Sequence, residues 1–277
     1  MNKHGNPGLA KSAAVASLAL AGALPLAAQA QAASEAWQFD ATIYGWFPSI
    51  GGSTSFPAGN GGPSLDVSAR QVIDALKFAF MGSFEAKRGQ WGLWTDLVYA
   101  DFGADKSGTR DFSVGQQNLP VGVTADLGLD IKSWIWTVAG TYSLAAEPAG
   151  TLDLLAGARL LDMDQRLRWT FSGNTNGQPL LPRTGSATVS LSNWDAVVGV
   201  KGRANLGNDG RWFIPYYLDV GGGESKLTWQ IIAGVGYQFG WGSLLATWRY
   251  LDYNFKSSSK VDSIDFNGIA LGATFKF

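Results

Sequence analysis

The sequence contains no cysteine and a single histidine, His4. A chain without cysteine can form neither a disulfide framework nor a thiolate metal site. Long hydrophobic runs are also scarce. Although 46% of the residues are hydrophobic, no stretch beyond the first 34 residues approaches the ~20 consecutive apolar residues of a membrane-spanning helix. The apolar residues are dispersed by alternation with polar ones, and this pattern indicates β-strands rather than helices.

The N-terminal segment has the features of a cleaved secretory signal peptide. Lys3 and Lys11 give it a positively charged start, and the alanine-rich apolar stretch that follows is interrupted by Pro25. Such a stretch makes a poor membrane span, so a retained anchor is the weaker alternative. Two A-x-A motifs predict cleavage after Ala30 or Ala32. The expected organisation is a signal peptide at 1–30, a short lead at 31–36 and one domain at 37–277.

The predicted mature chain is weakly acidic. Removing Lys3 and Lys11 from the 21 basic residues leaves 19 against 22 acidic residues, a net charge near −3. Cleavage also removes His4. No basic field is present that would attract nucleic acid, so we expect no nucleic-acid partner.

The C-terminal strand has an inverted polarity. Apolar side chains lie on one face, and small or polar side chains lie on the other. The apolar face consists of Ile269, Leu271, Ala273, Phe275 and Phe277. A strand that is apolar outside and polar inside suits a transmembrane β-barrel, because lipid meets the outer face. A soluble edge strand is the alternative interpretation.

The rest of the chain predicts an all-β, antiparallel, up-and-down transmembrane barrel of about ten strands, with eight as the alternative. Short turns alternate with long polar connections. A short helix is expected in the first long connection, residues 49–76, with Ser68 as N-cap. Two further loops are expected at 103–120 and 172–186. Because Asp126, Asp130 and Lys132 share the outward face, that half of their strand is expected to project beyond the membrane.

Several stretches resemble a family of small, largely uncharacterised outer-membrane β-barrel proteins of Gram-negative bacteria. They are Phe80–Asp101, Leu154–Arg159, Gly236–Phe239 and Trp248–Tyr253. The likeness runs through the mature chain in order and implies an outer-membrane location, with membrane lipid around the barrel. We expect the protein to be a monomer. The terminal strand is similar to the closing strand of such barrels, which implies that the barrel assembly machinery reads Phe275 and Phe277. The resemblance implies no catalytic residue.

The alternation also predicts which charges point into the barrel. Six acidic and five basic side chains face inward: Asp40, Glu85, Asp96, Asp153, Asp195 and Asp219, with Lys87, Arg159, Lys201, Arg203 and Arg249. Ions in a narrow lumen are tolerated when they pair and form hydrogen bonds, so one interpretation is an internal network that closes the barrel. The other interpretation is a narrow, weakly selective pore lined by Arg159, Arg203, Arg249 and the carboxylates that face them.

Catalysis is not expected. Proton transfer near neutrality usually employs histidine, and the predicted mature chain has none. A carboxylate-dependent enzyme stays open in principle, but the sequence does not indicate which carboxylates would act. Because no Asp-rich calcium-loop pattern is present, we expect no metal and no cofactor. The sequence therefore predicts a structural or porin-like barrel with restricted passage of small solutes, and the alternative function is recognition through the outer loops.

Overall fold

The computed structural model describes residues 36–54, 64–108, 123–175, 178–207, 209–256 and 261–277, and the predicted signal peptide lies outside these ranges. The elements are β1 (Gln38–Thr54), β2 (Ser64–Val67), α1 (Ala69–Ala75), β3 (Leu76–Arg88), β4 (Trp91–Gly108), β5 (Val123–Glu147), β6 (Gly150–Thr175), β7 (Gln178–Leu206), β8 (Trp212–Gly223), β9 (Ser225–Gln238), β10 (Gly242–Phe255) and β11 (Val261–Lys276).

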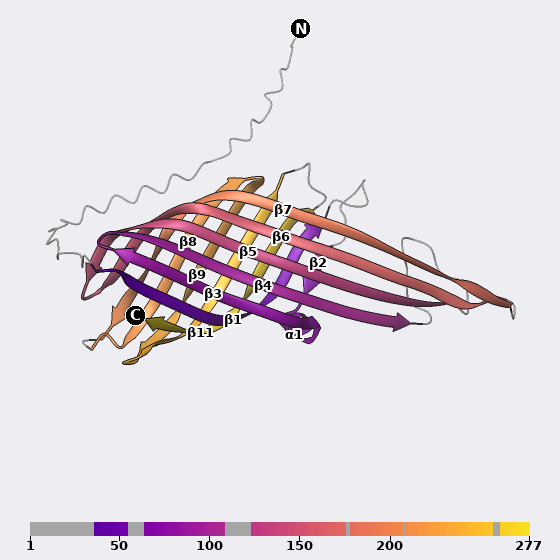
Figure 1. Ribbon diagram of the computed structural model, residues 1–277, viewed down its shortest axis with the longest axis horizontal. Helices are drawn as coiled ribbons and strands as arrows, with labels where there is room; N and C mark the ends of the chain where they lie inside the picture. The colour runs from indigo at the N-terminus through magenta and orange to yellow at the C-terminus, as the bar shows by residue number, and fades with distance from the viewer. Residues whose placement is uncertain (1–35, 55–63, 109–122, 176–177, 208, 257–260) are drawn as a thin grey trace, which may run out of the picture. The chain divides into compact units, whose positions relative to one another are not determined.

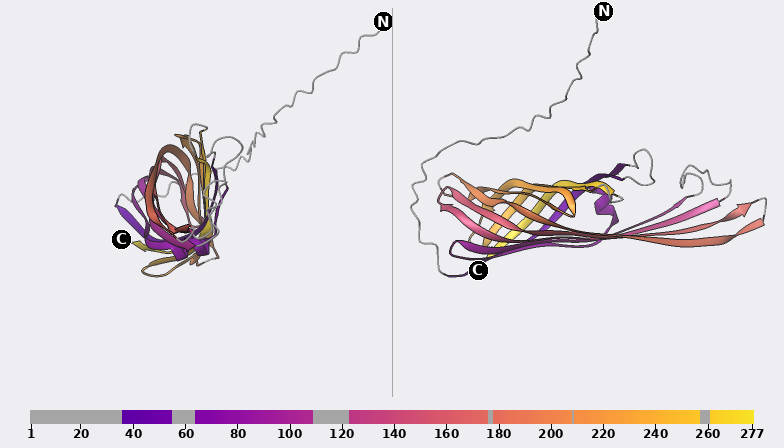
Figure 2. Two further views of the ribbon diagram at one scale, coloured as in Figure 1. Left: turned by 90° about the vertical axis from the view of Figure 1, so that its right-hand side faces the viewer. Right: turned by 90° about the horizontal axis from the view of Figure 1, so that it is seen from above.

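The strands form one antiparallel sheet that closes on itself. From β3 to β11 each strand pairs with the next along the chain, β1 pairs with β3, and β11 returns to pair with β1 over the whole length of β1. Figure 2, left, looks along the resulting barrel. The predicted closed, all-β, antiparallel barrel with one short helix is confirmed.

The sheet differs from the predicted ten strands, and from the alternative of eight, by including a strand outside the closed ring: β1 and β3–β11 close the barrel, and β2 pairs only with β1 among the described residues. The sheet contains eleven strands among the described residues. Residues 49–76 were expected to form a connection, but β1 continues into them as far as Thr54, and its residues Ile50–Ser53 pair with β2. The extra strand therefore lies inside the connection that was expected to hold only loop and helix.

Helix α1 forms for the predicted reason. The Ser68 hydroxyl accepts a hydrogen bond from the Gln71 backbone N–H, and the Gln71 side chain accepts one from the Ser68 backbone N–H. This reciprocal capping box satisfies donors that the first helical turn would otherwise leave open. Val72 is the buried residue of the helix. No helix of the described residues is long and apolar enough to cross a membrane.

Two of the expected loops are largely strand. Strands β5, β6 and β7 are 25, 26 and 29 residues long, and their outer halves extend beyond the rest of the barrel together with the end of β4 (Figure 1). We call this part, residues 103–108, 123–132, 163–175 and 178–193, the outer extension. The predicted loop at 172–186 is replaced by a β6–β7 hairpin, and part of the loop expected at 103–120 is the end of β4. Their glycine, serine and proline content suggested loops, but continuous pairing with the neighbouring strands overrides these local preferences.

The barrel has two unlike ends. Short turns join β3 to β4, β5 to β6, β7 to β8 and β9 to β10 at one end, which we call the turn end. The other end carries α1, β2 and the outer extension. This arrangement agrees with the predicted alternation of short turns and longer connections except between β8 and β9, which Glu224 alone joins at the end opposite the turn end.

Candidate functional site

The interior of the barrel is the candidate site because it holds most of the buried polar and charged side chains. Its central feature is Arg249 on β10, which is 2% exposed. The guanidinium donates hydrogen bonds to the Asp96 carboxylate (2.8 Å), the Tyr44 hydroxyl (2.7 Å) and the Gln230 amide oxygen (2.9 Å). Tyr44 in turn donates to the second Asp96 oxygen at 2.7 Å. Strands β1, β4, β9 and β10 are thus joined across the lumen, and the buried charge is paired and hydrogen-bonded.

A second buried cation, Arg159 on β6, completes the middle of the barrel. Its side chain has no exposed surface and forms an ion pair with Asp219 on β8. It also donates to the hydroxyl groups of Thr137 (3.1 Å) and Thr228 (3.4 Å), and Tyr217 donates to the same Asp219 carboxylate. We call the groups around Arg249 and Arg159 the arginine layer: Tyr44, Asp96, Gln230 and Arg249, with Thr137, Arg159, Tyr217, Asp219 and Thr228. Together they fill one cross-section of the lumen.

Nearer the turn end, three further predicted residues pair with one another and with Asp153. Lys87 approaches Asp153 at 2.5 Å and Glu85 at 3.8 Å, and Lys201 pairs with the other oxygen of Glu85. The Ser143 hydroxyl donates to Asp153 at 2.6 Å. These side chains are 3–20% exposed, which makes their pairing stronger than that of ion pairs on a solvated surface.

Three predicted charges have no cation or carboxylate partner within ion-pair distance among the described residues: Asp40, Asp195 and Arg203. The carboxylate of Asp195, on β7, accepts hydrogen bonds from the Asn193 amide (2.7 Å) and the Ser225 backbone (2.8 Å), so it anchors the tight β8–β9 connection. Asp40 on β1 lies directly across from Lys276 on β11 and from Glu85 on β3. The guanidinium of Arg203 donates to the Gln238 amide oxygen at 3.3 Å and lies 5.2 Å from the Phe213 ring.

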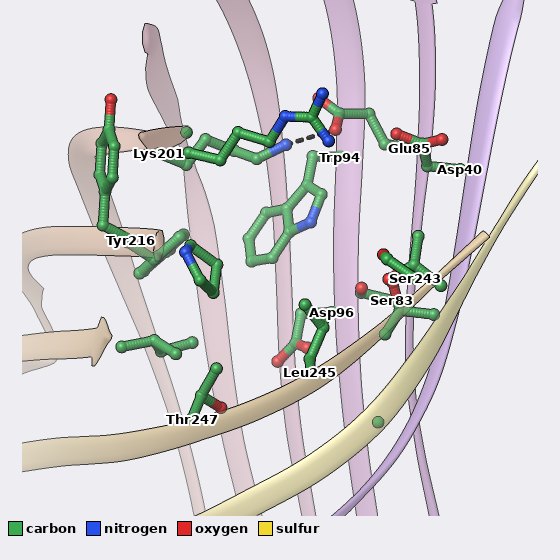
Figure 3. Close-up of a pocket in the computed structure, with 18 of the residues that line it drawn as sticks. Asp40, Ser83, Glu85, Trp94, Asp96, Lys201, Tyr216, Ser243, Leu245 and Thr247 are labelled. Carbon is green, nitrogen blue, oxygen red and sulfur yellow. Dashed lines mark hydrogen bonds and ion pairs between the residues drawn. The ribbon is translucent and has the colours of Figure 1, made fainter. Parts of the chain in front are cut away.

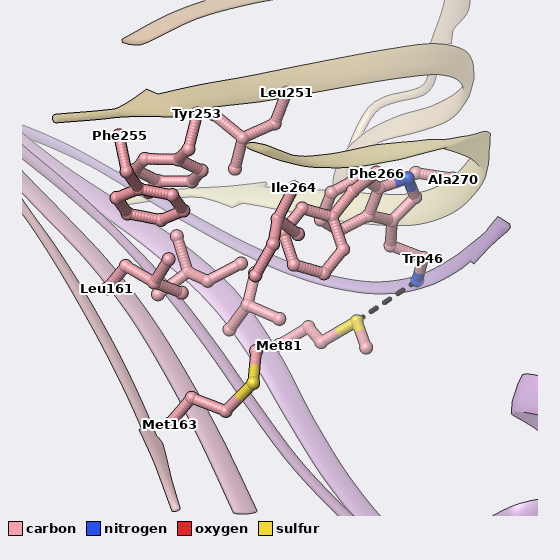
Figure 4. Close-up of a cluster of buried hydrophobic side chains, with 12 residues drawn as sticks. Trp46, Met81, Leu161, Met163, Leu251, Tyr253, Phe255, Ile264, Phe266 and Ala270 are labelled. Atoms are coloured by element: carbon pink, nitrogen blue, oxygen red, sulfur yellow. Dashed lines mark hydrogen bonds between the residues drawn. The ribbon is translucent and has the colours of Figure 1, made fainter. Parts of the chain in front are cut away.

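Beyond the arginine layer, away from the turn end, the interior is apolar. Twelve buried side chains pack there, and we call them the apolar cluster: Trp46, Met81, Val98, Ile135, Leu161, Met163, Leu251, Tyr253, Phe255, Ile264, Phe266 and Ala270. Figure 4 shows Tyr253 stacked on Phe255 and Trp46 beside Phe266. Leu161, Leu251 and Tyr253 have no exposed surface. The polar inner face that the closing strand predicted therefore does not extend through this half of the barrel.

The outward face of the barrel is apolar and carries aromatic side chains at two levels. At the turn end the pairs Trp91–Tyr142 and Trp212–Tyr237 have ring centroids 4.9 and 4.8 Å apart. Nearer the outer extension, Tyr99 lies 4.3 Å from Trp134, and Trp229 lies 4.9 Å from Tyr250. Of the predicted apolar face of the closing strand, Ile269, Leu271, Phe275 and Phe277 are exposed, and Ala273 is partly exposed.

The C-terminal residues complete the barrel. Phe277 exchanges two backbone hydrogen bonds with Phe39, at 2.9 and 3.0 Å, and the two rings stack 6.1 Å apart. Phe275 is 42% exposed on the outward face. The predicted apolar face of the terminal strand is thus continuous with the outward surface of β1.

In the outer extension the outward face changes from apolar to charged. Asp130 on β5 accepts hydrogen bonds from Lys77 (2.6 Å) and Arg168 (2.8 Å). The hydrogen bond from Lys77, with the nearby charge of Arg168, lowers the pKa of the Asp130 carboxyl from its ordinary value of 3.8. Lys132, close to Asp101 at 4.0 Å, is exposed on the same face. These charges lie past the second aromatic level, as their sequence positions predicted.

The inward charges were predicted as a list, but their neutral partners were not. Tyr44, Tyr217, Thr137 and Gln230 hold the two arginines in place, although alternation alone already put Tyr44 and Tyr217 on the inner face. The inward-facing hydroxyl and amide side chains on strands near each arginine would have been a useful additional signal, because they predict which neutral groups accept its hydrogen bonds. Among the described residues no group of His, Cys, Asp and Glu could hold a metal ion.

No family model matches the chain, and no curated protein matches it. Three solved structures show what the fold is similar to. The outer membrane protease OmpT from Escherichia coli gives a TM-score of 0.49 at 10% identity, covering 90% of this chain and 99% of that one. The translocator domain of the autotransporter NalP from Neisseria meningitidis gives 0.35 at 12% identity, over 87% and 88%. The attachment invasion locus protein Ail of Yersinia pestis gives 0.32 at 12% identity, over 88% and 99%.

Proposed function

We propose that this protein is an outer-membrane β-barrel with a sealed lumen, which serves as a membrane anchor for the outer extension. The observation that carries this proposal is the filled interior. The arginine layer and the apolar cluster occupy successive cross-sections, and their central side chains have at most 2% exposure. A solute has no continuous path past them. This arrangement supports a structural role rather than the restricted passage that the sequence also allowed.

The outward face supports the membrane location. Trp91 and Tyr99 mark the two aromatic levels on β4. They are separated by roughly eight residues of strand, which is ~26 Å along the strand and ~20 Å along the barrel axis for a tilt of ~40°. That height is comparable to the apolar band of about 25 Å in outer-membrane barrels, where aromatic girdles mark both interfaces. We propose that the C-terminal strand, with Phe275 and Phe277, is what the assembly machinery reads.

The outer extension favours recognition at the cell surface as the activity of the anchored protein. It consists of long paired strands with a charged outward face rather than of short connections. Its far edge, the outer half of β7, pairs with β6 on one side only among the described residues. We expect no catalysis, because the only histidine of the chain is His4 and the paired carboxylates of the lumen have structural partners.

Conductance in a planar lipid bilayer tests the sealed lumen. The folded protein should give no discrete channel steps, and its folding should be verified by faster migration on a detergent gel before boiling than after it. Discrete steps from protein that passes this check would contradict the proposal and restore the porin-like interpretation.

The absence of cysteine gives a clean test of location and orientation. Thr188→Cys places one thiol on the outer extension, and Arg211→Cys places one at the turn end; both positions are exposed. A membrane-impermeant maleimide should label Thr188→Cys on intact cells and Arg211→Cys only after permeabilisation. Equal labelling of both variants on intact cells would rule out the proposed orientation.

A further inference from the structure

A cavity of about 490 Å³ lies between the arginine layer and the turn end. Side chains from the ends of most strands line it, and Arg249, Asp96 and Tyr44 belong to its inner wall. Because these inner groups also belong to the arginine layer, the cavity is blind on the side of the outer extension. Its volume falls within the range of small-molecule sites in proteins.

The charges that line the cavity do not balance. Five cations and four carboxylates contribute to the lining: Lys87, Lys201, Arg203, Arg249 and Lys276, with Asp40, Glu85, Asp96 and Asp153. Three cations pair directly with carboxylates, namely Arg249 with Asp96, Lys201 with Glu85 and Lys87 with Asp153. A fourth, Lys276, lies directly across from Asp40 in the β1–β11 register. The lining therefore carries one positive charge more than negative charge, and Arg203 is the cation with no carboxylate either within ion-pair distance or directly across from it among the described residues.

The Arg203 guanidinium is placed to receive an anion. Its recorded neighbours are the Gln238 amide oxygen at 3.3 Å and the face of Phe213 at 5.2 Å, and both are neutral. A guanidinium has five donors, and its planar fork matches a carboxylate or sulfonate through two parallel hydrogen bonds. One long hydrogen bond leaves most of this donor capacity unused by the described residues.

The other walls of the cavity are apolar. Figure 3 shows Trp94 below the Lys201–Glu85 pair and Leu245 further down in the view, and both residues line the cavity. Ile232 and Phe213 add further apolar surface. A ligand that fits such walls has an apolar body as well as a charged group.

We propose that this cavity binds a small organic anion, a carboxylate or sulfonate with an apolar body, that enters from the turn end. The anionic group lies on Arg203, and the apolar body lies between Trp94 and Leu245. In the orientation proposed above, the ligand comes from the periplasm, and the sealed lumen holds it without passing it on.

Three probes of one shape and different charge test the proposal on the wild-type protein. Benzoate, benzyl alcohol and benzylamine are titrated calorimetrically into the folded protein in micelles, with protein-free micelles as blank. Benzoate should bind saturably and at least tenfold more tightly than the other two. No saturable binding of benzoate, or equal binding of all three probes, would overturn the proposal.

Variants then locate the site. Arg203→Gln should weaken benzoate binding at least tenfold, and Arg203→Lys should retain part of it because the charge remains. Arg211→Gln is the matched control, since Arg211 is an exposed cation at the turn end outside the cavity lining, and it should bind benzoate as the wild type does. Undiminished binding to folded Arg203→Gln would overturn the assignment. If Arg203→Gln does not fold, Arg203→Lys and the three-probe comparison still decide.

Discussion

Removing the guanidinium of Arg249 should destabilise the barrel more than almost any other single change. Arg249→Met keeps much of the side-chain volume but deletes the hydrogen bonds to Asp96, Tyr44 and Gln230. Asp96 is 4% exposed, so its carboxylate would remain buried with only the Tyr44 hydroxyl as a partner. Leaving one member of a buried ion pair uncompensated costs ~3–5 kcal/mol. That cost lowers the folding equilibrium constant by roughly two to four powers of ten.

A double variant separates the ion pair from the packing around it. Asp96→Leu combined with Arg249→Met removes both charges, so no ion is left unpaired in the lumen. Buried pairs that are replaced together by apolar residues often cost little. We therefore expect the double variant to be more stable than Arg249→Met alone, and the coupling energy of the cycle to exceed ~1 kcal/mol.

The assay is equilibrium urea unfolding of the folded protein in micelles, approached from both the folded and the unfolded side. Arg211→Met serves as the control, because Arg211 is exposed and its loss should change stability by no more than ~0.5 kcal/mol. A loss below ~1 kcal/mol for Arg249→Met, or a double variant no more stable than the single one, would refute the account of the arginine layer.

Three further predictions concern other parts of the barrel. Leu161→Ala should cost ~2–5 kcal/mol by leaving a cavity in the apolar cluster, whereas Val198→Ala, at an outward position that is 57% exposed, should cost much less in the same urea assay. Gly157→Ala should lower the free energy of unfolding by ~1–3 kcal/mol, because the added Cβ would lie 2.0 Å from the Val138 carbonyl oxygen. Gly140→Ala is the control, since its Cβ would meet nothing closer than 3.9 Å. Equal losses of stability in the two variants would contradict the close packing at Gly157. The pKa of the Asp130 carboxyl should lie below 3.8 in an NMR pH titration, and Lys77→Ala should raise it. A carboxyl whose pKa is lower in the folded state stabilises the fold at pH values above its unfolded-state pKa. The contribution of the Lys77–Asp130 contact to stability should therefore be lost as the pH falls through the lowered pKa.

The alternation of the sequence predicted most of the barrel because its period is local. Whether Trp91 or Trp94 faces outward follows from the strand on which both lie, and the structure bears this out, with 69% and 8% of their surfaces exposed. The pairing of charges is not local. Arg249 meets Asp96 across the lumen from a strand far away in the sequence, and Lys201 meets Glu85 in the same way. Such contacts depend on barrel closure and strand stagger, which the single sequence does not specify.

The outer extension was missed for a different reason. The segment at 172–186 contains glycine, serine and proline, and these residues favour turns when no partner strand is considered. In the structure, Trp169 lies directly across from Gly185, and an added Cβ at Gly185 would fall 2.5 Å from the Trp169 ring. The glycine thus makes room for a neighbouring side chain within a paired strand. Pairing with β6 therefore overrides the local turn propensity of this segment.

In the proposed membrane location, the apolar cluster lies where the barrel would leave the bilayer. Past Tyr250 the alternation on β10 reverses its polarity: Leu251 and Tyr253 point inward, and Asp252 and Asn254 point outward. On β11, Ile264 and Phe266 point inward while Asp265 and Asn267 point outward. Inside a bilayer, an apolar interior gains nothing relative to lipid, so the lumen there is filled with paired charges and hydrogen bonds.

Beyond the second aromatic level, in the proposed orientation, water surrounds the barrel. Burying apolar side chains there is favourable by roughly 25 cal/mol per Å², as in a soluble protein. Under this proposal, the apolar cluster is the hydrophobic core of the part of the barrel outside the membrane, and the arginine layer fills the lumen within the bilayer. The sequence alone can predict this reversal once the two aromatic levels are located. On each strand that continues past the second level, the inner face should change from polar to apolar and the outer face from apolar to polar at the same height.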